Sequence, residues 1–115
     1  MRELGIGFVS YYALGLGFFA DAVKNLSDLK ADDSRRKVPR FYQENFDHNA
    51  RLLKELQKVA AAKRCTVAQL SLAWILHQGD FFVPIPGTLR ISHLEENVRA
   101  ADVVLSLEED RKSVV

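Results

Sequence analysis

The pattern of apolar positions predicts two short strands in this chain. Residues 5–11, Gly-Ile-Gly-Phe-Val-Ser-Tyr, are rich in β-branched and aromatic side chains, and glycines at positions 15 and 17 break the chain after them. Residues 81–85, Phe-Phe-Val-Pro-Ile, form a second apolar run, which Pro86 and Gly87 follow. Both runs are short and bounded by turn residues, so we expect two buried strands.

Helical spacing and helix-capping patterns predict about four helices. Apolar residues recur at helical spacing from 46 to 64, and Asn45 or Asp47 is the expected N-cap. Three capping boxes, each a Ser or Thr followed three residues later by Glu or Gln, predict the other starts. These pairs are Thr66 with Gln69, Ser92 with Glu95, and Ser106 with Glu109. The helix after Thr66 is apolar over too wide a face for a surface helix, and Gly79 is expected to end it.

The segment from 21 to 45 is polar and mixed in charge, and it shows no regular period. It therefore predicts a long loop with at most one turn of helix. Loops of this length are usually functional or disordered, and the alternative is that Arg35, Arg36 and their charged neighbours simply form a solvated run.

Composition and charge restrict the class of protein. The chain has 115 residues and a formal net charge of +1, which allows one domain and gives no reason to expect a nucleic-acid or membrane partner. Cys65 is the single cysteine, so an internal disulfide is excluded and a reducing compartment is favoured. No apolar run reaches the ~20 residues of a membrane span. No His or Cys spacing fits a metal site. A soluble, cytoplasmic protein without a metal is expected.

Residues 84–97 are a candidate phosphate site. A strand ends in a turn containing Gly87, and the turn leads into the start of a helix, where backbone N–H groups are unpaired and the helix dipole is positive. Arg90 adds a cation that can form forked hydrogen bonds with phosphate oxygens. The alternative is an ordinary strand-to-helix connection with a solvated arginine.

The amino-acid sequence of this stretch is more specific than the chemistry of its residues. Ile-Pro-Gly-Thr, a short basic segment and then Leu-Glu-Glu-Asn resembles the last strand and helix of the aldo-keto reductases, which are NADPH-dependent (β/α)8-barrel oxidoreductases. Residues 5–18 resemble the seventh strand segment of the same family. A complete barrel takes ~250 residues. The resemblance therefore implies an α/β fold that is the incomplete C-terminal part of a TIM-type barrel, with two parallel strands and about four helices, in a partial cofactor-binding domain over residues 1–115.

The resemblance also implies which residues hold NADP(H). The turn and helix after the second strand would hold the 2′-phosphate and adenosine, the loop after the first strand would wrap the pyrophosphate, and an aromatic side chain would stack on the nicotinamide. The segment from 21 to 45 would fold over the cofactor as a belt. The expected binding residues are Tyr11, Leu14, Gly15, Gly17, Gly87, Thr88, Arg90, His93, Glu96 and Asn97.

Several positions depart from the family pattern. Leu16 and Leu89 stand where the family usually has cations, and His93 stands where it more often has Gln, Tyr or Arg. The loss of these cations is expected to weaken pyrophosphate binding and the preference for NADPH over NADH.

Three functions follow from the resemblance. Aldo-keto reductases reduce small carbonyl substrates with a tyrosine, a lysine, an aspartate and a histidine from the first four strands, and no residue here matches those motifs. The chain is therefore expected to be a truncated NADPH-dependent aldo-keto reductase that keeps the cofactor-binding end. The alternatives are a non-catalytic cofactor sensor like the potassium-channel β-subunits, or an inactive fragment. Two strands with unpaired edges also predict low stability.

Overall fold

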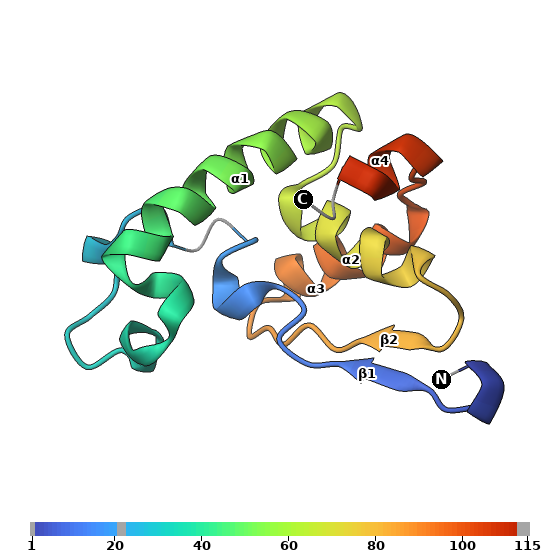
Figure 1. Ribbon diagram of the computed structural model, residues 1–115, viewed down its shortest axis with the longest axis horizontal. Coiled ribbons are helices and arrows are strands. Elements are labelled where there is room, and N and C mark those ends of the chain that lie inside the picture. The colour runs from blue at the N-terminus through green and yellow to red at the C-terminus, as the bar shows by residue number, and fades with distance from the viewer. Residues whose placement is uncertain (1, 21–22, 113–115) are drawn as a thin grey trace.

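The computed structural model describes residues 2–20 and 23–112, and Figure 1 shows its elements. Two strands and four α-helices lie within the described residues, as the sequence predicts. They are β1 (Phe8–Ser10), α1 (Gln43–Ala62), α2 (Val67–His77), β2 (Phe82–Pro84), α3 (Ile91–Val98) and α4 (Leu107–Lys112). Six short 3-10 helices join them: η1 (Arg2–Leu4), η2 (Gly15–Gly17), η3 (Leu26–Asp28), η4 (Ser34–Lys37), η5 (Pro39–Phe41) and η6 (Arg99–Asp102).

The two strands are parallel neighbours, as expected. Phe8 lies opposite Phe82, Val9 opposite Val83, and Ser10 opposite Pro84. Helix α2 packs along β2, and the strand pair extends beneath it (Figure 1). Because the strands are parallel, their carboxyl ends lie at the same edge, so the turns that follow them start close together.

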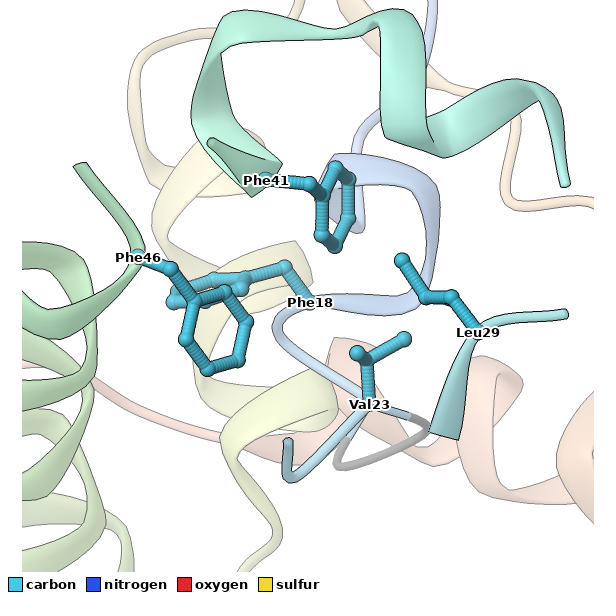
Figure 2. Packing of buried hydrophobic residues seen from close by; sticks show 5 residues of the cluster. All are labelled: Phe18, Val23, Leu29, Phe41 and Phe46. Carbon is cyan, nitrogen blue, oxygen red and sulfur yellow. The ribbon is translucent and has the colours of Figure 1, made fainter. Parts of the chain in front are cut away.

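A cluster of buried apolar side chains lies beside α1 and away from the strands. Figure 2 shows its five buried side chains. Four of them come from the segment between β1 and α1, and the fifth, Phe46, comes from the first turn of α1. They are Phe18, Val23, Leu29, Phe41 and Phe46. The Phe18 ring meets the rings of Phe41 and Phe46 edge to face, with centroids 6.3 and 5.9 Å apart. Such rings bury a large area in a preferred geometry, so they hold this segment against α1.

The expected structure of the segment before α1 is wrong in one respect. Its described residues, from 23 on, form three 3-10 turns rather than a loop with at most one turn. Arg36 donates to the backbone carbonyls of Leu26, Leu29 and Lys30 at 3.2, 2.6 and 2.8 Å. Arg35 forms an ion pair with Asp33 at 2.7 Å. These charges therefore hold the segment together instead of forming a solvated run.

The expected N-cap of α1 is also wrong. The helix begins at Gln43 with Tyr42 as its N-cap, so Asn45 and Asp47 lie inside its first turns. The Asn45 side chain donates to the carbonyl of Pro39 at 2.9 Å, and the Asp47 carboxylate accepts from the Gln43 side chain at 3.2 Å. Both polar side chains have other partners, and the preceding 3-10 turn sets the start of the helix.

The start and end of α2 agree with the sequence. Thr66 and Gln69 form the expected capping box, in which each side chain binds the other residue's backbone N–H at 3.1 and 3.0 Å. Gly79 follows the helix with φ +137°, a value that favours glycine. The buried positions of α2 are Ala68, Leu70, Leu72 and Ala73, so this helix is largely buried as predicted.

The capping box expected at the start of α3 does not form. The helix begins at Ile91 with Arg90 as its N-cap, so Ser92 is the second residue of the helix. The N–H of Arg90 donates instead to the hydroxyl of Thr88 at 3.1 Å. This turn brings the chain into helical geometry one residue ahead of Ser92. The box at Ser106 and Glu109 forms as predicted and starts α4.

Candidate functional site

A cleft of about 650 Å³ lies where the turn after β1 meets the turn and helix after β2. All the expected cofactor-binding residues line it except Tyr11 and Gly15. Its lining residues are Leu14, Gly17, Ala20, Ala68, Gly87, Thr88, Leu89, Arg90, His93, Glu96 and Asn97. The parallel strands explain this grouping, because the segments that leave their carboxyl ends meet at one edge. Two stretches about 70 residues apart in the sequence therefore share one cleft.

One side of the cleft is a turn that ends at a helix start. Thr88 accepts a hydrogen bond from the Arg90 N–H, and this bond fixes the approach to α3. No side chain caps the start of α3, so its first backbone N–H groups are available to a ligand. Arg90 is exposed, and no ion pair engages it within the described part of the chain. A hydroxyl, a guanidinium and a helix start thus gather beside one another, and together they can bind an anion.

The other side of the cleft is the 3-10 turn after β1. It holds an unusual backbone, with positive φ at Gly15 (+58°), Leu16 (+60°) and Gly17 (+89°). A Cβ on Gly15 would run into the guanidinium of Arg40 and would lie 3.1 Å from the Phe19 ring. Gly15 is buried and does not line the cleft. We infer that glycine is needed at this position because it allows the turn to close.

A hydrogen bond also ties this turn to the segment before α1. The Arg35 guanidinium donates to the carbonyl of Leu16 at 3.4 Å, and Asp33 holds that guanidinium in place. Asp33 accepts hydrogen bonds from the side chain and the backbone of Arg35, and the pKa of this carboxyl is lowered to about 2. None of the described residues from 23 to 42 lines the cleft. The segment packs beside the turn in this structure, and the belt over a cofactor stays a prediction.

Tyr11 lies at the end of β1, outside the cleft lining. Its side chain is 70% exposed and stacks on the ring of Tyr12, with centroids 3.8 Å apart. The Tyr12 side chain, by hydrogen bonding, is the main cause of a raised pKa at Tyr11, so this phenol stays protonated at neutral pH. An exposed aromatic pair offers a flat surface for stacking, and the role expected for Tyr11 stays a prediction.

Two residues of the cleft wall were not predicted from the sequence. Ala20 and Ala68 line it with small, uncharged side chains. Ala68 lies in the first turn of α2, and the side-chain amide of Gln69 donates to the carbonyl of Glu96 at 3.0 Å, which fixes α2 against α3. An alanine carries no group that marks it as part of a site, and only the position of the helix shows it.

No metal site and no membrane span occur in the part of the chain that the structure describes. No cluster of three or more His, Cys, Asp or Glu residues is placed there to hold a metal ion. Its helices are all too short or too polar to cross a bilayer.

The sequence profile of the aldo/keto reductase family matches residues 1–112, and the chain belongs to this family. The family implies a (β/α)8 barrel, of which the described residues show a small α/β portion. The chain is 49% identical over 105 residues to the aldo-keto reductase yakc of Schizosaccharomyces pombe (strain 972), whose full name includes NADP(+). The match covers 91% of this chain and 31% of that relative, so the chain spans about a third of the relative's length.

Proposed function

We propose that the cleft binds NADP(H), and that the chain forms the cofactor-binding end of an NADPH-dependent aldo-keto reductase. The observation that supports this most directly is the common cleft between the Leu14–Gly17 turn and the Gly87–Asn97 segment. A dinucleotide has two phosphate regions, and this cleft has a turn for each. Its volume of about 650 Å³ falls in the range typical of small-molecule and cofactor sites.

The 2′-phosphate would lie at the turn before α3. Gly87 allows the ligand to approach the backbone, Thr88 offers a hydroxyl, and Arg90 offers a charged fork. The uncapped start of α3 adds backbone N–H groups and the positive end of the helix dipole. Of these groups, Arg90 and the helix start favour a phosphate over a neutral hydroxyl.

The rest of the cofactor would extend from this point along the cleft. His93, Glu96 and Asn97 recur along α3 and would reach the adenosine. The turn from Leu14 to Gly17 would face the pyrophosphate, with Gly15 holding its shape. Tyr11 would stack on the nicotinamide beyond the end of β1. When bound, the cofactor would supply the hydride, and the residues here would hold and orient it.

Carbonyl reduction also needs a proton donor and its partners. The four side chains of the family's reaction have no match among these 115 residues. We therefore expect this chain alone to bind the cofactor without turning over substrate, and a complete enzyme to reduce a small aldehyde or ketone. A cytoplasmic location, expected from the single cysteine, belongs to the same proposal.

The test is a titration of the purified chain with NADPH, followed by nicotinamide fluorescence. We expect saturable binding, and we expect Arg90→Ala to weaken it by about tenfold or more, the size of a lost charge-assisted hydrogen bond. Arg99→Ala is the matched control, because Arg99 is exposed just after α3 and does not line the cleft. A folded chain that shows no saturable binding would rule out the proposal. Binding without aldehyde reduction would agree with it.

A further inference from the structure

The turn after β1 contains one residue whose backbone conformation is unfavourable for its type. Leu16 has φ +60° and ψ +34°, in the left-handed region. A residue with a Cβ is strained there, so this conformation persists only where surrounding contacts hold it. Leu16 lies between Leu14 and Gly17, which both line the cleft. The contacts that hold Leu16 therefore also fix one wall of the cleft.

We propose that Arg35 is a positioning residue for this cleft. It holds Leu16 in the left-handed conformation and so sets the affinity of the cleft for the pyrophosphate part of the cofactor. The proposal rests on the proposed function, because it concerns the same cleft. It assigns no contact between Arg35 and the ligand, since Arg35 does not line the cleft.

The guanidinium of Arg35 joins a carboxylate to the strained turn. Its Nε and Nη2 atoms donate to the two oxygens of Asp33 at 3.0 and 2.7 Å, and Nη1 donates to the carbonyl of Leu16 at 3.4 Å. The backbone N–H of Arg35 also donates to Asp33, at 2.9 Å. The two side chains are only 29% and 18% exposed. A planar fork can serve both partners at once, which a lysine ammonium cannot do in the same geometry.

The segment that carries Arg35 packs against the same turn at two further points. The guanidinium of Arg40 lies over the Phe19 ring, 5.8 Å from its centroid, and stands where a Cβ on Gly15 would lie. Phe18 packs edge to face on Phe41 (Figure 2). These contacts place the segment against a side of the turn that does not line the cleft. Arg35 adds the hydrogen bond to the strained residue itself.

The next residue, Arg36, provides a matched comparison. Its guanidinium donates to three backbone carbonyls, those of Leu26, Leu29 and Lys30. All three belong to the segment before α1, so these bonds hold the segment together and do not reach the turn after β1. Loss of either arginine should loosen the segment, but only loss of Arg35 should release Leu16.

The test is isothermal titration calorimetry of the full chain with NADPH and with adenosine 2′-monophosphate. The second ligand lacks the pyrophosphate and the nicotinamide, so under the proposed function it uses only the α3 side of the cleft. We expect Arg35→Ala to weaken NADPH binding about three- to tenfold, the size of one hydrogen bond, and to leave binding of adenosine 2′-monophosphate unchanged. Arg36→Ala should not change the ratio of the two affinities. Circular dichroism checks that each variant is folded.

Two other variants separate positioning from direct contact with the ligand. Asp33→Asn keeps an acceptor for the Arg35 N–H but removes the charged partner of the guanidinium, so NADPH binding should weaken. A guanidinium that bound the phosphates directly would be freed by this change, and binding would strengthen. Leu16→Gly removes the strain, because glycine adopts this φ readily. In that background Arg35→Ala should weaken NADPH binding by a clearly smaller factor.

Several results would overturn the role of Arg35 and leave the proposed function standing. These are equal weakening of both ligands by Arg35→Ala, the same selective loss in Arg36→Ala, stronger NADPH binding in Asp33→Asn, or an undiminished effect of Arg35→Ala in the Leu16→Gly background. A folded chain that binds neither ligand would overturn both proposals.

Discussion

Lys63 and Glu109 form an ion pair that fixes the C-terminal part of the chain to the end of α1. Their Nζ and Oε2 atoms lie 2.9 Å apart, and the two side chains are 21% and 27% exposed. The same Lys63 ammonium donates to the carbonyl of Val104 at 2.6 Å. Glu109 also accepts from the backbone N–H of Ser106 at 2.8 Å. One cation therefore holds the segment before α4 and the first turn of that helix together.

This contact predicts a loss of stability in acid. The pKa of Glu109 is lowered from 4.5 to about 2, mainly by the hydrogen bond from the Ser106 N–H and then by Lys63. A carboxyl whose pKa is lower in the folded state adds stability above its unfolded pKa, and that stability is lost as the pH falls through the folded value. The melting temperature should therefore drop between pH 4.5 and about 2. Differential scanning calorimetry across this range measures it.

Glu109→Gln should lower the melting temperature at neutral pH and flatten the curve in acid. Glu55→Gln is the control, because Glu55 pairs with Lys58 on the exposed face of α1, with side chains 69% and 71% exposed. Exposed pairs of this kind contribute little to stability. If the acid curve of Glu109→Gln matched that of the natural chain, the ion pair would have no part in acid unfolding.

The capping box of α2 predicts a second measurable effect. Thr66→Ala removes the acceptor for the Gln69 N–H and should lower the free energy of unfolding by about 0.5–2 kcal/mol. Thr66→Ser keeps a hydroxyl in that place and should lose much less. Urea denaturation followed by circular dichroism compares the two. Equal losses would mean that packing of the threonine methyl group, and not the cap, stabilises this helix start.

The burial of residues along α2 predicts a third measurable effect. Leu72 is 2% exposed, whereas Leu76, one turn later, is 39% exposed. Leu72→Ala should lower the free energy of unfolding by about 2–5 kcal/mol, since it leaves a cavity in the core. Leu76→Ala should cost less than about 1 kcal/mol. The same denaturation experiment measures both. Similar losses in the two variants would contradict the burial of Leu72 in the core.

The features that sequence could predict depend on nearby residues. Helical spacing and the boxes at Thr66 and Ser106 depend on contacts within one or two turns, so the positions of α2 and α4 followed from them. The box at Ser92 failed although its spacing is the same. There the Thr88 hydroxyl accepts from the Arg90 N–H, and the helix starts before Ser92 is reached. A cap pattern shows which residues can cap, and the preceding turn decides which one does.

The segment before α1 could not be predicted for a different reason. Its apolar residues show no regular period, and yet Val23, Leu29 and Phe41 join one cluster with Phe18 from the turn after β1. Such contacts depend on the path of the whole segment. The resemblance to a family, and not local spacing, predicted that Gly87, Thr88 and Arg90 act together with Gly17. The parallel strands bring these residues to one cleft, and their binding of a cofactor stays a prediction.

Substitution by alanine should lower the stability of the chain at Gly15 and leave it almost unchanged at Gly87. Gly15 has φ +58°, and a Cβ there would meet the Arg40 guanidinium and the Phe19 ring, so Gly15→Ala should cost about 1–3 kcal/mol of stability. Gly87 has no positive φ, and no atom lies within 4 Å of the place that a Cβ would take. Gly87→Ala should therefore change stability by no more than about 0.5 kcal/mol. Thermal melting without ligand measures both effects.

The same pair separates a glycine that shapes the turn from one that admits the ligand. Under the proposed function, Gly87→Ala places a methyl group where the nucleotide approaches the backbone, so it should weaken NADPH binding while the melting temperature stays unchanged. Gly15→Ala should weaken binding only as far as it disturbs the turn that holds Leu14 and Gly17 in the cleft wall. Normal NADPH affinity in Gly87→Ala would mean that the cofactor does not pass close to this turn. A fall in melting temperature as large as that of Gly15→Ala would show that Gly87 is needed for the fold instead.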